Sequence, residues 1–153
     1  MGPVRFIVLD CGEDKADDHP EYSGLVAFSG YRQAQAEWLK QELASPEFNQ
    51  ARYRVLVHHI PLYGSESSEP SRKRWAPVLA GAAIDLAVSA HTHRWRIIRV
   101  GEMGNPYPAV IGGGPEMDRA TVIELTADTA GLRAVIKDAD GQQLDQFTGA
   151  RTR

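Results

Sequence analysis

Residues 54–61 read RVLVHHIP. Their apolar part is short and rich in β-branched side chains, and Pro61 ends it, which is the pattern of a buried strand. Residues 84–93 read IDLAVSAHTH and have the same form. Each apolar run ends in a pair of histidines. Because ligands collect beyond the carboxyl ends of strands in open α/β sheets, two such neighbouring strands would direct imidazoles into one crevice.

The elements around these two strands predict a β-α-β-α-β order. Residues 3–10 carry another apolar run and predict a first strand that begins almost at the first residue. Residues 11–30 are rich in Gly, Asp, Glu and Pro and predict a long loop that could form a wall of a site. Residues 31–43 predict an amphipathic helix, and residues 72–79 predict a short helix despite Pro77.

The remainder of the chain predicts short strands joined by turns. They fall near residues 95–100, 107–111, 120–126, 132–137 and 144–147. We therefore expect one domain over residues 1–148, of mixed α/β (α+β) class. It would have a mixed sheet with helices on one face and a C-terminal antiparallel meander, followed by a frayed tail at residues 149–153.

Composition excludes several classes of partner. The chain has 153 residues, with 20 acidic against 17 basic side chains, so it carries no basic footprint for nucleic acid. No apolar stretch approaches the roughly 18–20 residues of a membrane span, and no signal peptide is evident. The single cysteine, Cys11, excludes an internal disulfide and is compatible with a reducing cytosol. A signal sequence upstream would change that expectation, so localisation stays open.

The histidines are typical of a transition-metal site. His91 and His93 are separated by one residue, so both can reach one centre. Three nitrogen ligands resemble part of a catalytic zinc site, whereas two bridged metals need carboxylates. The alternative is that the histidines are hydrogen-bonded packing residues. The candidate carboxylates, all near the predicted long loop, are Asp10, Glu13, Asp14, Asp17 and Asp18.

Other patterns offer weaker chemistry. Residues 17–19 read DDH, a metal-ligand spacing, but they lie inside a polar loop. Residues 112–114 are three glycines that could cradle a phosphate, but no helix or lysine follows, so a flexible turn is the better interpretation. Cys11 has no base beside it, and Ser89 is not in a Gly-x-Ser-x-Gly elbow, so a nucleophilic triad is not indicated.

The two histidine segments together resemble the C-terminal half of the calcineurin-like metallophosphoesterases, the superfamily of the purple acid phosphatases. In that family one strand ends in histidine, any residue, proline, which is His59-Ile60-Pro61 here. Another ends in glycine, histidine, any residue, histidine, which is residues 90–93 here, with Ala90 for the glycine. The resemblance extends over roughly residues 4–100.

The resemblance implies half of a four-layer αββα sandwich and a metal-dependent phosphoric ester hydrolase, a phosphatase or phosphodiesterase with a phosphoester substrate. It implies that His59 and His91 bind one metal and His93 the other. The full family enzyme holds two ions of Zn, Mn or Fe, and at most one is expected here. The family's earlier motifs, which supply the bridging aspartate, have no counterpart in this sequence. The chain is therefore expected to be a C-terminal fragment, weak or inactive, with no catalytic residue of its own.

Three further residues are candidates to contact the substrate or to support the metal ligands: His58, Asp10 and Tyr63. A half sandwich exposes an apolar sheet face, so we expect a homo-oligomer or a missing N-terminal half as the partner. Two alternatives stay open. One is a non-catalytic metal-binding or assembly module that retains a mononuclear histidine site, and the other is a structural domain without metal.

Overall fold

A five-stranded mixed sheet forms the centre of the molecule. The computed structural model describes residues 2–149. The strands are β1 (Val4–Leu9), β2 (Tyr53–His58), β3 (Leu86–Ser89), β4 (Arg96–Ile98) and β5 (Ala109–Ile111), in the order β1-β2-β3-β5-β4. All pairs are parallel except β4 with β5. The predicted adjacency of the two histidine-ended strands is confirmed, because β2 and β3 pair directly.

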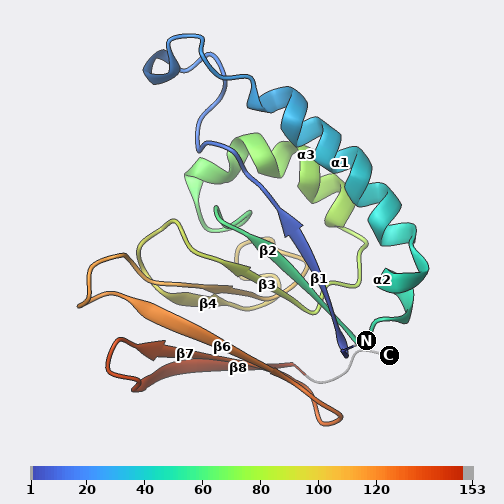
Figure 1. Cartoon of the computed structure of the whole chain (residues 1–153), viewed down its shortest axis with the longest axis vertical. Coiled ribbons are helices and arrows are strands. Elements are labelled where there is room, and N and C mark those ends of the chain that lie inside the picture. Colours follow the sequence, from blue (N-terminus) through green and yellow to red (C-terminus); the bar gives the residue numbers. More distant parts are fainter. Residues whose placement is uncertain (1, 150–153) are drawn as a thin grey trace.

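Helices cover one face of this sheet (Figure 1). They are α1 (Phe28–Ala44), α2 (Pro46–Gln50) and α3 (Glu69–Leu79), with single 3-10 turns at Pro20–Tyr22 and Glu66–Ser68. The sequence did not predict α2. Ser45 and Pro46 end α1, but they also begin α2, because the Ser45 hydroxyl accepts from the Phe48 N–H at 3.1 Å. No helix within residues 2–149 has the length and apolarity to cross a bilayer.

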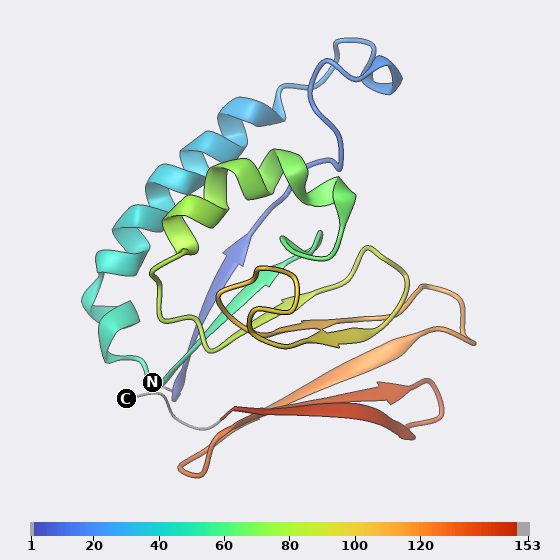
Figure 2. The ribbon, with the colours of Figure 1, turned by 180° about the vertical axis from the view of Figure 1, so that it is seen from behind.

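A second, three-stranded antiparallel sheet lies against the other face of the main sheet (Figure 2). It comprises β6 (Thr121–Ala127), β7 (Leu132–Asp138) and β8 (Gln143–Gly149). The predicted class, a mixed sheet with helices on one face and a C-terminal meander, is confirmed. The meander is shorter than predicted, because β4 and β5 join the main sheet. Gly149 ends β8, and the rest of the expected tail, residues 150–153, lies outside the described residues.

Alternation along the strands divides the core in two. Leu56 points toward the helices, where it packs with Ile7, Leu39 and Trp75. Its neighbour Val55 points to the second sheet. The core between the sheets is built from alternate residues of both, namely Tyr53, Val55, Leu86, Val110, Leu132, Ala134 and Ile136. Because β2 is buried on both faces, it reads as a continuous apolar run rather than an alternating one.

The burial of β2 makes a testable prediction. Leu56 is fully buried, so L56A should lower the free energy of unfolding by roughly 2–5 kcal/mol through lost apolar contacts and a cavity. The matched control is L25A, because Leu25 is 88% exposed in a loop and its truncation should cost no more than about 0.5 kcal/mol. Urea unfolding of both variants measures the difference, and equal midpoints would contradict this description of the core.

Candidate functional site

His59 and His91 meet at the carboxyl edge of the main sheet. Their ring centroids are 5.2 Å apart, and the rings are nearly perpendicular, at 85°. The pairing of β2 with β3 continues beyond the strands, because the Ala90 N–H donates to the His59 carbonyl at 2.9 Å. This hydrogen bond holds the segment after β2 and the segment after β3 side by side. The strand ends therefore bring two imidazoles from different segments together, as the sequence pattern predicts.

The loop after β3 directs its two histidines differently. His91 and His93 both adopt left-handed backbone conformations, with φ of 61° and 56°. Such angles are uncommon for residues other than glycine and concentrate at functional sites. His91 turns toward His59, whereas His93 lines a cleft of about 310 Å³. The other residues that line this cleft are Arg94, Trp95, Asp118, Arg119, Ala120, Thr121, Asp138 and Leu144.

The described residues therefore present a pair of metal-ligand candidates rather than a complete set. Among residues 2–149, no group of three or more His, Cys, Asp or Glu side chains is arranged to hold a metal ion. His59 and His91 lie together, but their predicted role as ligands of one ion stays a prediction. His93, predicted as a further ligand, stays a prediction.

The surroundings of His91 favour its neutral form. Partial burial lowers the pKa of His91, and the nearby His59 lowers it further, while Asp14 opposes these effects. A neutral imidazole is the form that binds a metal. His91 is therefore in the protonation state that a ligand needs at neutral pH.

His58 is a core residue beneath the histidine pair. Only 3% of its surface is exposed. Its Nδ1 lies 2.7 Å from the Ile60 carbonyl and 3.2 Å from the Ser89 hydroxyl. Since a carbonyl only accepts, Nδ1 carries the proton, and within the described chain Nε2 is buried without a hydrogen-bond partner. His58 thus holds the turn that presents His59.

The long loop after β1 approaches the pair from one side. Asp14 is the loop carboxylate that affects the pKa of His91. It accepts from the Lys15 ammonium at 2.9 Å and from the Tyr22 hydroxyl at 3.3 Å. The Lys15 ammonium is the main cause of the lowered pKa of Asp14. An ionised carboxylate therefore lies near the imidazole pair.

Arg32, which the sequence analysis missed, anchors this loop. It is fully buried, and its guanidinium donates to the carbonyls of Cys11, at 2.8 Å, and of Glu13. The Trp75 indole N–H donates in turn to the Arg32 carbonyl at 3.0 Å. A sequence signal was present, because Arg32, Ala36 and Leu39 follow one helical stripe and the last two are apolar. An arginine on such a stripe indicates a buried donor with carbonyl partners.

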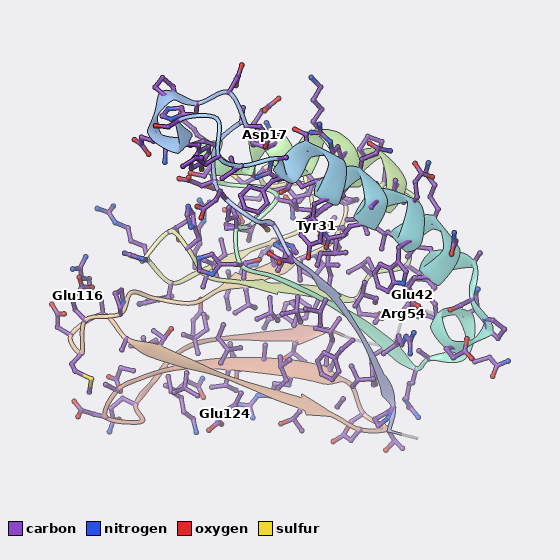
Figure 3. The ribbon with its side chains drawn as sticks, turned by 45° about the horizontal axis from the view of Figure 1, so that its top comes forward. Asp17, Tyr31, Glu42, Arg54, Glu116 and Glu124 are labelled. Atoms are coloured by element: carbon purple, nitrogen blue, oxygen red, sulfur yellow. The ribbon has the colours of Figure 1, made fainter. Side chains whose placement is uncertain are left out.

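The DDH segment has structural roles. The Asp17 carboxylate accepts from the backbone N–H groups of Phe28 and Ser29, at 3.0 and 2.9 Å, and so caps the first turn of α1 (Figure 3). These hydrogen bonds lower the pKa of Asp17. The His19 Nδ1 accepts from the Glu21 N–H at 3.3 Å and caps the following 3-10 turn. The spacing that resembles a metal motif is explained by these caps.

Asp10 and Tyr63, candidates for substrate contact or ligand support, have other partners in the structure. The Asp10 carboxylate accepts from the Tyr31 hydroxyl at 3.1 Å and from the Gly12 N–H at 2.9 Å. The Tyr63 ring packs edge-to-face against Tyr107, with centroids 6.1 Å apart. Both roles proposed from the sequence stay predictions.

The three glycines after β5 allow close backbone contact. A Cβ at Gly113 would lie 2.1 Å from the Arg119 carbonyl, which no other residue could accommodate. The Gly112 N–H donates to the Ser89 carbonyl at 2.8 Å. These residues form the tight connection between the two sheets, which agrees with a turn rather than a phosphate cradle.

Comparison with known proteins gives a likeness in fold. No family model matches the sequence, and no curated protein matches it. Among solved structures, the chain is similar to GAP50, the anchor in the inner membrane complex of Plasmodium, with a TM-score of 0.64 and 17% sequence identity. The match covers 98% of this chain and 50% of that chain. The chain thus spans about half the length of the structure that it matches.

These findings correct the family assignment. The strand-end motifs resemble those of the calcineurin-like metallophosphoesterases, but the assignment of the chain to that superfamily is wrong: the comparison finds GAP50, described as an anchor. At 17% identity, the likeness to GAP50 shows the fold alone. The physical reason for the error is that short motifs such as HIP and HTH mark strands ending in histidine, and many unrelated strands can end so. No comparison supports phosphoester hydrolysis, which stays a prediction.

The burial of His58 predicts a dependence of stability on pH. Burial lowers the pKa of His58 from 6.5 to about 4. The unfolded chain therefore binds this proton more readily, so the stabilisation is complete above about pH 6.5 and is lost as the pH falls toward about 4. Between about pH 7 and about pH 5 the wild type should lose roughly 2 kcal/mol more unfolding free energy than H58Q. Urea unfolding at both pH values measures this difference, and parallel losses would show that His58 is not the group responsible.

Proposed function

We propose that this chain is a non-catalytic binding and assembly module that retains a mononuclear histidine site, with His59 and His91 as its paired ligands. The observation that carries the proposal is the 5.2 Å separation between the ring centroids of two imidazoles, which lie just after the neighbouring strands β2 and β3. Its role would be to hold chain segments and partners together rather than to transform a substrate.

The fold comparison supports the assembly part of the proposal. GAP50 is described as an anchor, and its likeness to this chain covers 98% of the residues here. An anchor needs a stable fold and a docking surface, but it needs no reacting groups. If this chain is part of a longer protein, we propose the same assembly role for the part that this chain forms.

The donor set supports a weakly held single ion. Two imidazoles suit zinc and similar transition metals, and structural zinc sites use four ligands. With two protein ligands paired, water would complete the coordination. A bound ion would join the ends of β2 and β3 and would stabilise the folded chain in proportion to its occupancy.

Phosphoester hydrolysis finds less support in the same residues. A two-metal mechanism needs carboxylates that bridge the ions. The Asp10 carboxylate accepts from Tyr31 and Gly12, and the Asp17 carboxylate caps α1. The donor set therefore favours binding over hydrolysis.

Zinc binding tests the proposal. We expect about one zinc ion per wild-type chain at saturation, and at least a tenfold weaker affinity in H59A and in H91A, because each variant removes one of two paired ligands. H93A measures whether the third predicted ligand contributes. Isothermal titration calorimetry with zinc chloride, together with the melting temperature with and without zinc, gives the readout.

H19A is the matched control, because His19 only caps a loop turn. H19A should bind zinc as the wild type does. A wild-type chain that binds no zinc would contradict the metal site, and so would equal losses of affinity in H19A and H91A.

A further inference from the structure

β1 is an edge strand of the main sheet. It pairs with β2 on one side, and within residues 2–149 no strand pairs with its other side. Edge strands present unpaired N–H and C=O groups that can template pairing with another chain. The groups that β1 exposes can be identified residue by residue.

The direction of each backbone group follows from its neighbours. The Tyr53 N–H donates to the Pro3 carbonyl at 3.0 Å. The backbone N–H and C=O groups of the odd-numbered residues in this segment therefore face β2. In a parallel strand, alternate residues point to opposite sides. The N–H and C=O groups of Val4, Phe6 and Val8 therefore face the open edge.

The open edge has a defined end. The side chain of Gln35 bonds both main-chain groups of Asp10, accepting from its N–H at 2.8 Å and donating to its carbonyl at 2.7 Å. A side-chain amide thus occupies the position of a neighbouring strand at Asp10. Pairing along the open edge of β1 is therefore limited to Val4, Phe6 and Val8.

Apolar side chains flank this edge on the face of the main sheet that is turned toward the second sheet. Phe6 is 52% exposed and Val8 is 65% exposed, although both point to the face that packs on the second sheet. They are uncovered because the second sheet is narrower than the first, and its β8 lies against β4 at the far side. An aromatic and a β-branched side chain thus remain in contact with water.

One stripe of α1 flanks the edge on the helix side. Tyr31, Gln35, Trp38 and Glu42 follow one stripe of α1. Three of them contact the β1 segment: Tyr31 and Gln35 bond Asp10, and Glu42 bonds Arg5. Figure 3 shows Tyr31 and Glu42 on α1 beside β1. Trp38 belongs to the same stripe and is 44% exposed.

The usual protection of an edge strand is missing. Natural edges are often blunted by a charged side chain that points outward. The single charged residue of β1, Arg5, is held by two 2.7 Å hydrogen bonds from its guanidinium to the Glu42 carboxylate. A groove of about 810 Å³ also runs beside the first half of the strand, lined by residues 2–6 and by α2 with the residues that follow it.

We propose that β1 is a dimerisation strand that pairs antiparallel with β1 of a second copy of this chain, about a two-fold axis through Phe6. This register places Phe6 opposite Phe6 and Val4 opposite Val8, so all three outward-facing residues form hydrogen-bonded pairs. The strand pairing ends at Asp10, because the Gln35 side chain already bonds the N–H and C=O groups of Asp10. The inference rests on the assembly part of the proposed function and is independent of the metal.

The charge pattern of β1 is compatible with pairing to a second copy. At a two-fold axis each residue meets its own copy, so a charged residue there would repel itself. The residue on this axis is Phe6, its neighbours on the shared face are valines, and Arg5 is neutralised by Glu42. The strand is thus complementary to itself.

The available area sets the strength of the pairing. Phe6, Tyr31 and Trp38 are each about half exposed, so together they offer roughly 250–350 Å² per copy. Standard stable interfaces use about 800 Å² per partner. Val8, the strand backbone and α2 add to this area, so we expect a dimer that dissociates on dilution.

A charge-swap experiment tests the axis. F6K and F6E each place like charges across the two-fold axis, so each variant should sediment as a monomer. Their melting temperatures should match that of the wild type, because Phe6 is half exposed. An equimolar mixture should restore the dimer, since opposite charges then face each other. Sedimentation velocity over a concentration series measures the species. V122K, on the outer face of β6 and 56% exposed in the wild type, is the control and should dimerise as the wild type does.

Three outcomes would overturn the proposal: a wild-type chain that stays monomeric at high concentration, a dimer that persists in F6K, or a mixture that does not restore the dimer. In the first case the edge would serve another protein strand. H91A separates the two proposals, because it should dimerise fully while losing zinc affinity.

Discussion

The parallel pairing of β2 with β1 on one side and β3 on the other is the constraint on which the rest of the structure depends. β2 is buried on both faces, so its side chains divide between the helix core and the core between the sheets. Parallel pairing also brings the carboxyl ends of the strands to one edge. His59 and His91 contact each other because their strands are neighbours.

The main sheet carries both the imidazole pair and the open edge strand. Its carboxyl edge carries the imidazole pair, while its lateral edge, β1, carries exposed Phe6 and Val8. The second surface arises because a three-stranded sheet covers a five-stranded one incompletely.

Much of this architecture could be predicted from the sequence. Apolar runs ending in histidines predicted β2, β3 and their adjacency, because strand periodicity and burial are local signals. The helical stripe indicates that Arg32 is buried, but its carbonyl partners and the cap made by Asp17 could not be predicted, since each depends on a partner elsewhere in the fold. The left-handed turns at His91 and His93 were missed as well, because histidine adopts positive φ too rarely for its presence to signal such a turn. Short motifs also led to a family assignment that the comparisons do not uphold.

The most direct test of the central claim is a crystal structure of the chain soaked with zinc, with anomalous diffraction recorded at the zinc absorption edge. The account predicts one anomalous peak between the imidazoles of His59 and His91. A map with no peak there, or with the peak at His19 instead, would contradict it.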